Sequence, residues 1–165
     1  MFELKTLSKA AVPRALEKAE RYRLLNEPVE AESICEDVLR VDPDNQKALV
    51  MLLLALTDQF ARLGGNLRQA REVLPRLRDE YERAYYAGII SERRAKAHLD
   101  HGGPGSGFAA YDLFRQAMES FEKAQEIRPP GNDDAVLRWN ACARILMRHP
   151  GLQPGPEERV ELPLE

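Results

Sequence analysis

The sequence predicts an all-α protein built from paired helices. Apolar residues recur at three- and four-residue steps throughout the chain, and no segment shows the alternation of apolar and polar residues that is typical of a half-buried strand. Clusters of proline and glycine interrupt these stretches at distances that suit helices of ordinary length. The 165 residues fit one domain. We expect that domain to span residues 1–150 and to be followed by an extended, proline-rich tail at 151–165.

The charge of the chain favours neither nucleic acid nor a membrane surface as a partner. With 24 Lys and Arg against 27 Asp and Glu, the formal charge of −3 gives no general attraction to phosphate or anionic lipid. The apolar run at 51–56 is far too short to span a bilayer, and the N-terminus does not resemble a signal peptide. We therefore expect a cytoplasmic protein. Cys35 and Cys142 lie far apart and indicate neither a disulfide framework nor a zinc site.

The first two helical hairpins are expected at residues 12–42 and 44–87. Pro13 and Pro28 suit the first turn of a helix, and the residue before Pro43 is disfavoured in a helical conformation. The third helix is apolar almost all round and should be the most buried one. The helices of these two hairpins are expected at about 13–25, 28–41, 44–63 and 66–87.

The third hairpin is expected at residues 89–128, and a last helix at 133–148 covers the open end of the stack. Gly88 is interpreted as the border between two helices. Gly102–Gly107 predicts a mobile loop. It does not resemble a phosphate-binding loop, because it does not end in Gly-Lys followed by Ser or Thr and no strand precedes it. Asn132–Asp134 offers caps for the last helix. The total is roughly seven helices.

Two segments of the chain share one spacing of small and bulky residues. The separations are four, three and five residues, and each segment closes with a proline: Ala31, Cys35, Val38 and Pro43 in the first, and Ala117, Phe121, Ala124 and Pro129 in the second. Ala19 and Tyr22 add a small and an aromatic residue in the helix that precedes the first segment. Small residues at such positions let paired helices approach closely, while the bulky residue fills the remaining space.

This pattern resembles the tetratricopeptide repeat, as in small bacterial proteins of that family. Ala19 and Tyr22 match the small and aromatic positions of the first helix of the repeat, and the shared spacing matches its second helix. Cys35 and Val38 depart from it, because the family usually has an aromatic residue and an alanine there. The resemblance implies a right-handed α-solenoid of about three hairpins with a covering C-terminal helix.

The resemblance also implies a concave groove, lined by the first helices of successive hairpins, that holds a protein or peptide segment. Arg138 and Arg144 on the last helix are candidates for binding a carboxylate. Some members of the family clamp the C-terminal carboxylate of heat-shock chaperones with Lys and Asn, which are replaced here by Leu16 and Glu20. By their position in the repeat, the residues expected to face the groove are Leu16, Glu20, Arg23, Lys47, Val50, Leu54 and Asp58.

The expected function is that of a protein-binding scaffold or adaptor, and two alternatives remain open. A chain with three such repeats also resembles the translocator chaperones of type III secretion, which are dedicated to one exported protein. The other alternative is a self-assembling module, including a homodimer. No catalytic, metal-binding or cofactor-binding residues are predicted, because His98, Asp100 and His101 straddle a helix end and no serine has a neighbouring base. The mixed charges at 68–96 are interpreted as a solvated helix face.

Overall fold

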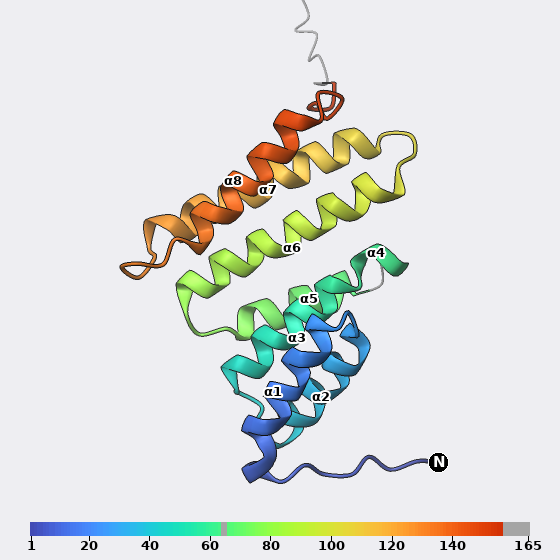
Figure 1. Ribbon diagram of the computed structural model, residues 1–165, viewed down its shortest axis with the longest axis vertical. Coiled ribbons are helices and arrows are strands. Elements are labelled where there is room, and N and C mark those ends of the chain that lie inside the picture. The colour runs from blue at the N-terminus through green and yellow to red at the C-terminus, as the bar shows by residue number, and fades with distance from the viewer. Residues whose placement is uncertain (64–65, 157–165) are drawn as a thin grey trace, which may run out of the picture.

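The structure, a computed structural model, is all-helical over the residues that it describes, 1–63 and 66–156. The predicted all-α class is therefore confirmed. The helices follow one another along the long axis of the molecule, from α1 and α2 at one end to α7 and α8 at the other (Figure 1). Their bounds are Val12–Leu24 for α1, Pro28–Val41 for α2, Gln46–Asp58 for α3, Phe60–Leu63 for α4, Leu67–Val73 for α5, Glu80–His101 for α6, Ser106–Glu126 for α7 and Asp134–Arg148 for α8.

Helices α1 and α2 lie where the sequence predicts them. Pro13 and Pro28 occupy first turns, where a proline sacrifices no helical hydrogen bond. In the turn between the helices Asn26 has a φ of 60°, a conformation that asparagine tolerates better than most residues. Helix α2 ends just before Asp42, which leaves the helical region ahead of Pro43.

The expected third helix, 44–63, is divided into α3 and α4. Asn45 caps α3, because its side-chain oxygen accepts a hydrogen bond of 2.9 Å from the backbone N–H of Ala48. Gln59 separates the two helices, and its side-chain amide donates a hydrogen bond of 2.6 Å to Glu32 of α2. The glycines at the expected end of this helix lie outside the described residues.

The helix border expected at Gly88 is wrong. Helix α5 stops at Val73, and Pro75 lies in a short 3-10 turn, Leu74–Arg76, because proline lacks the N–H that would continue the α-helix. Helix α6 then runs without interruption through Gly88. The helical stretch that the sequence places at 66–87 is therefore broken early, and the one expected to start at residue 89 begins at Glu80.

Helices α6 and α7 form a long antiparallel pair (Figure 1). The turn between them uses Gly102, Gly103 and Gly105 at φ values of 65°, 104° and 77°, which glycine adopts without steric cost. The loop expected at Gly102–Gly107 is shorter than predicted, because Ser106 already belongs to α7.

Helix α8 and the start of the tail cover the end of the molecule next to α7. Leu152 is 9% exposed and packs with the core residues of α6, α7 and α8. Its backbone N–H donates a hydrogen bond of 2.9 Å to the carbonyl of His149. The tail expected at 151–165 is thus docked at its first residues, and its part beyond residue 156 lies outside the described residues.

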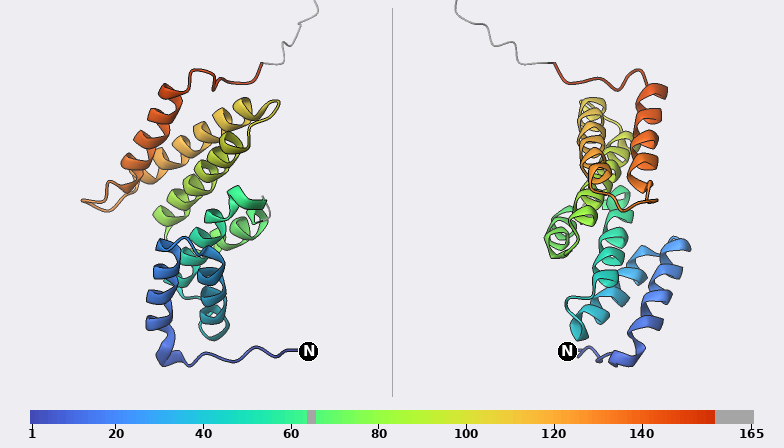
Figure 2. Two further views of the ribbon diagram at one scale, coloured as in Figure 1. Left: turned by 45° about the vertical axis from the view of Figure 1, so that its right-hand side comes forward. Right: turned by 90° about the vertical axis from the view of Figure 1, so that its left-hand side faces the viewer.

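The core consists of two main clusters that meet between α3 and α6. Helices α1, α2, α3 and α5 contribute most of the N-terminal cluster, and α6, α7 and α8 contribute most of the C-terminal cluster (Figure 2). Ile90 of α6 packs in the N-terminal cluster, while Leu54 of α3 packs against the C-terminal one. The repeated small and bulky residues of the sequence are fully buried: Ala19, Ala31, Cys35, Val38, Ala117, Phe121 and Ala124.

Candidate functional site

A pocket with a volume of about 640 Å³ opens between α1, α3 and the start of α6. Its volume lies within the range of pockets that bind ligands. The apolar side chains that line it are those of Val12, Pro13, Leu16, Val50 and Met51, of which Val12 and Leu16 are buried. The charged side chains that line it are those of Glu17, Glu20, Lys47 and Glu82. We call this site the acid-rimmed pocket.

Three carboxylates and one ammonium group surround the apolar part of the acid-rimmed pocket. Glu17, Glu20 and Lys47 are exposed, whereas Glu82 of α6 is half-buried. Burial, reinforced by the neighbouring Asp79, raises the pKa of the Glu82 carboxyl. A cationic group beside Glu82 would favour the charged form of its carboxyl and so offset the effects of burial and of Asp79.

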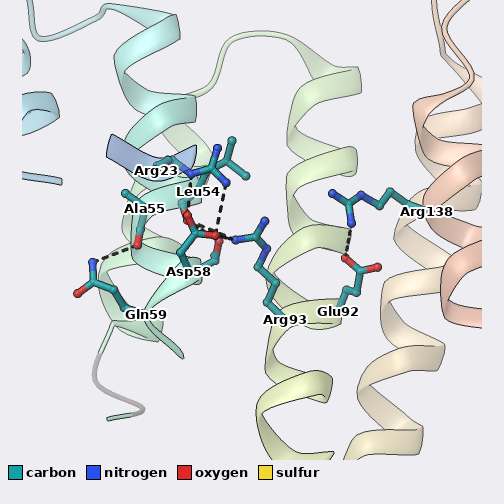
Figure 3. Close-up of polar contacts among 9 residues, drawn as sticks. Arg23, Leu54, Ala55, Asp58, Gln59, Glu92, Arg93 and Arg138 are labelled. Atoms are coloured by element: carbon teal, nitrogen blue, oxygen red, sulfur yellow. Dashed lines mark hydrogen bonds and ion pairs between the residues drawn. The ribbon is translucent and has the colours of Figure 1, made fainter. Parts of the chain in front are cut away.

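Asp58, at the end of α3, joins this helix to α1 and to α6. Arg23 of α1 donates from Nε to Oδ2 of Asp58 at 2.7 Å, and Arg93 of α6 pairs with the other carboxylate oxygen (Figure 3). The backbone carbonyl of Leu54 also accepts a hydrogen bond of 3.5 Å from Arg93. The three charged side chains are only 18–21% exposed, so water screens them weakly. This cluster holds α1, α3 and α6 in register.

Glu92, one residue before Arg93, makes the equivalent connection from α6 to α8. Its side chain is fully buried, and Nη1 of Arg138 lies 3.4 Å from Oε2 (Figure 3). Nζ of Lys96 lies 3.7 Å from Oε1. The thiol of Cys142 donates to Oε1 at 3.6 Å. Burial alone would lower the pKa of Arg138, but the attraction of Glu92 outweighs it and the pKa is raised. Arg138 is therefore paired with Glu92 inside the protein, and this pairing competes with the binding of an external carboxylate.

A smaller pocket of about 260 Å³ lies between α3, α6 and α8, and Asp58 is part of its lining. Its charged lining side chains are those of Asp58, Arg93, Lys96, Asp100 and Arg138. Most of these charges already have partners in the two clusters described above. The charged side chains of this pocket therefore mainly connect the helices and are not free to bind an anion.

The residues that the sequence places in a groove fall into four groups in the structure. Leu16, Glu20, Lys47 and Val50 come together in the acid-rimmed pocket. Arg23, Leu54 and Asp58 belong to the junction between α1, α3 and α6, and Arg138 pairs with Glu92. Arg144 is exposed on α8 and is not part of the lining of either pocket.

Sequence reasoning missed three residues of this region: Glu82, Glu92 and Arg93. The expected solvated face at 68–96 does hold an exposed pair, Arg68–Glu72. Glu92 is different, because it lies three residues from both Ile89 and Ala95 on the buried face of α6. A charged residue within a stripe of apolar residues was the sequence signal that could have indicated the burial of Glu92.

The residues that the structure describes contain neither a metal-binding cluster nor a membrane-spanning helix. Over ranges 1–63 and 66–156, no group of three or more His, Cys, Asp or Glu side chains gathers closely enough to hold a metal ion. Within the same ranges, no helix has both the length and the apolar character required to cross a membrane. Comparison of the chain with protein-family models, curated proteins and solved structures finds no match.

Proposed function

We propose that this protein is a non-catalytic scaffold that binds a protein or peptide segment in the acid-rimmed pocket. The observation that carries the proposal is the convergence of α1, α3 and α6 on an apolar pocket that carries three carboxylates and one ammonium group. Concave apolar surface with a few charged groups is typical of a recognition site. The ion pairs of Asp58 keep the three helices in place and so preform the pocket.

We propose a right-handed solenoid of the tetratricopeptide type as the framework, and the pairing of successive helices agrees with a stack of hairpins. Helix α1 packs with α2, α3 with α5, and α6 with α7, while α8 follows as a cover. Contacts also join α1 to α3 and α3 to α6, so the first helices of successive hairpins neighbour one another. In such a stack these helices form the inner face. The free, buried Cys35 and Cys142 agree with a reducing compartment such as the cytoplasm.

The chemistry of the pocket favours a segment with an apolar anchor next to a Lys or Arg. Val12, Leu16, Val50 and Met51 would cover the anchor, and Glu17, Glu20 and Glu82 would attract the cation. A C-terminal carboxylate is a poor ligand here, because the carboxylates of the pocket would repel it.

Display of random peptides against the full-length protein tests this proposal. Selected peptides should combine an aliphatic or aromatic residue with a nearby Lys or Arg, and fluorescence anisotropy should show that their affinity falls as salt is raised. The double substitution Glu17→Lys with Glu20→Lys should weaken binding about tenfold or more. Both side chains are exposed, so the fold should be unaffected.

The matched control reverses two exposed carboxylates elsewhere, Glu119→Lys with Glu126→Lys on α7. It changes the net charge of the protein by the same amount and should leave the affinity unchanged. Peptides that bind both double variants equally well would show that the acid-rimmed pocket is not the binding site. Failure to select any peptide would also count against the proposal.

A further inference from the structure

The N-terminal arm, residues 1–8, carries apolar side chains that its own fold does not cover. Phe2 is fully exposed and Leu4 is 72% exposed. The arm leaves the α1–α2 end of the molecule and extends beyond it (Figures 1 and 2). Both side chains are therefore available to contact another molecule.

The arm is held on the side of α1 and α2 that faces away from the acid-rimmed pocket. Leu7 is half-buried beside Ala15 of α1 and Ile34 of α2, and the guanidinium of Arg40 in α2 lies 3.5 Å from the carbonyl of Lys5. At 100° per residue, Ala15 lies on a different face of α1 from Glu17 and Glu20. The observed path of the arm therefore leads away from the pocket of the same chain.

The pattern of the arm complements the acid-rimmed pocket. In an extended segment Phe2 and Leu4 lie on one face, and Glu3 and Lys5 lie on the other. With Phe2 and Leu4 directed into the apolar lining, the long side chain of Lys5 can still reach the exposed carboxylates of Glu17 and Glu20 at the rim. Lys9, just after the arm, adds a second cation that is exposed.

We propose that the N-terminal arm of one copy of this chain docks in the acid-rimmed pocket of a second copy. This inference rests on the proposed function, since it assumes that the pocket binds a segment, and it names the occupant. The arm and the pocket are different surfaces of one molecule, so the contact is head-to-tail and each copy both gives an arm and receives one.

Two full-length variants test the docking by complementation. The arm variant, Phe2→Asp with Leu4→Asp, keeps the pocket, and the pocket variant, Val50→Lys, keeps the arm. Leu24→Lys is the matched control, because Leu24 is 79% exposed on α1 outside the pocket. Sedimentation velocity over a concentration series measures association, and circular dichroism checks that each variant is folded.

Wild type and the control should associate as concentration rises, whereas each variant alone should lose affinity about tenfold or more. A mixture of the two variants should form a heterodimer and no larger species, because it contains one intact arm–pocket contact. If Val50→Lys unfolds the chain, the folded double variant Glu17→Lys with Glu20→Lys replaces it.

Three results would overturn the docking: a wild type that stays monomeric at every concentration, an arm variant that associates like wild type, or a mixture that stays monomeric. The proposed function fails separately, through the peptide selection. A monomeric wild type whose pocket binds selected peptides would mean that the pocket is a binding site with a different occupant.

Discussion

Asp58 connects α1, α3 and α6 through its ion pairs with Arg23 and Arg93. Its carboxylate receives arginines from α1 and α6, both 35 positions away in sequence. A partly buried charge that loses its partner remains poorly solvated, so removal of one member of such a cluster costs more than removal of an exposed ion pair. The acid-rimmed pocket is built from the same three helices, and stability and binding are therefore linked at this side chain.

Asp58→Asn should lower the free energy of unfolding by about 1–2 kcal/mol, because Arg23 and Arg93 lose their shared counter-charge. Urea denaturation followed by circular dichroism measures this. The control is Glu72→Gln in the exposed pair with Arg68, whose side chains are 90% and 62% exposed. That change should stay within about 0.5 kcal/mol. Equal effects of the two substitutions would contradict the structural role of Asp58.

The two cysteines give a prediction for the pH dependence of reactivity and stability. Burial, with nearby carboxylates, raises the pKa of both Cys35 and Cys142 to about 12. The thiolate is the reactive form. Iodoacetamide at pH 8 should therefore modify neither thiol in the folded chain and both in urea. Rapid modification under native conditions would show that the thiols are not buried as described.

The raised pKa values of the two cysteines also predict how the free energy of unfolding changes with pH. The unfolded chain loses thiol protons from about pH 9, whereas the folded chain keeps them until about pH 12. The free energy of unfolding should therefore be unaffected by these groups below pH 9 and fall as pH rises from 9 towards 12. A Cys35→Ala, Cys142→Ala variant should show a shallower fall in urea titrations, and an identical slope would contradict this assignment.

At the scale of the element, Gly88 shows why α6 stays continuous where a break seems natural. A Cβ atom built on Gly88 would lie 2.5 Å from Cε1 of Phe121, which is fully buried in α7. Phe121 also packs on Tyr85, with the ring centroids 5.7 Å apart. Glycine at this position lets α6 and α7 approach each other closely. This explains why α6 contains a glycine in its interior, although glycine is usually unfavourable inside a helix.

Gly88→Ala should lower the free energy of unfolding by about 1–2 kcal/mol, although alanine is the better helix former by about 1 kcal/mol. Gly107→Ala in α7 is the control, because its Cβ atom would meet its nearest neighbour at 3.6 Å. That substitution should be neutral or stabilising in the same thermal or urea denaturation. A stabilising Gly88→Ala would mean that α6 and α7 are not packed as the structure shows.

At the scale of the whole molecule, α3 and α6 decide whether the two core clusters unfold together. Ile90 is 5% exposed and belongs to the N-terminal cluster although it comes from α6. Trp139, the only tryptophan, packs against the C-terminal cluster and donates a hydrogen bond of 2.9 Å to Glu122. Tryptophan fluorescence therefore reports on the C-terminal half, whereas circular dichroism reports on all helices.

Ile90→Ala should remove about 2–4 kcal/mol of stability and uncouple the halves, because it empties part of their interface. In wild type the fluorescence and circular dichroism transitions should coincide. In the variant the fluorescence transition should come at higher urea than that of the N-terminal helices. Leu137→Ala, at a side chain that is 65% exposed, should leave both transitions in place. Coincident transitions in Ile90→Ala would show that another contact couples the halves.

The sequence by itself determined the all-α class, the first hairpin and the buried small residues. These features follow from local physics: helical periodicity, the missing N–H of proline, and the close approach that Ala19, Ala31, Ala117 and Ala124 permit. Position in the repeated pattern also selected Leu16, Glu20, Lys47 and Val50, which the fold brings into one pocket. Their role in binding stays a prediction.

Only the tertiary structure decided where α6 begins, why Gly88 lies inside it, and which charges are buried. The apolar neighbours of Glu92 signal its burial, but the sequence contains no record of which side chains pair with Glu92 or Arg93. Their partners Arg138 and Asp58 lie 46 and 35 positions away. The energy of a charge depends on its surroundings, and those surroundings exist only once distant helices have packed together.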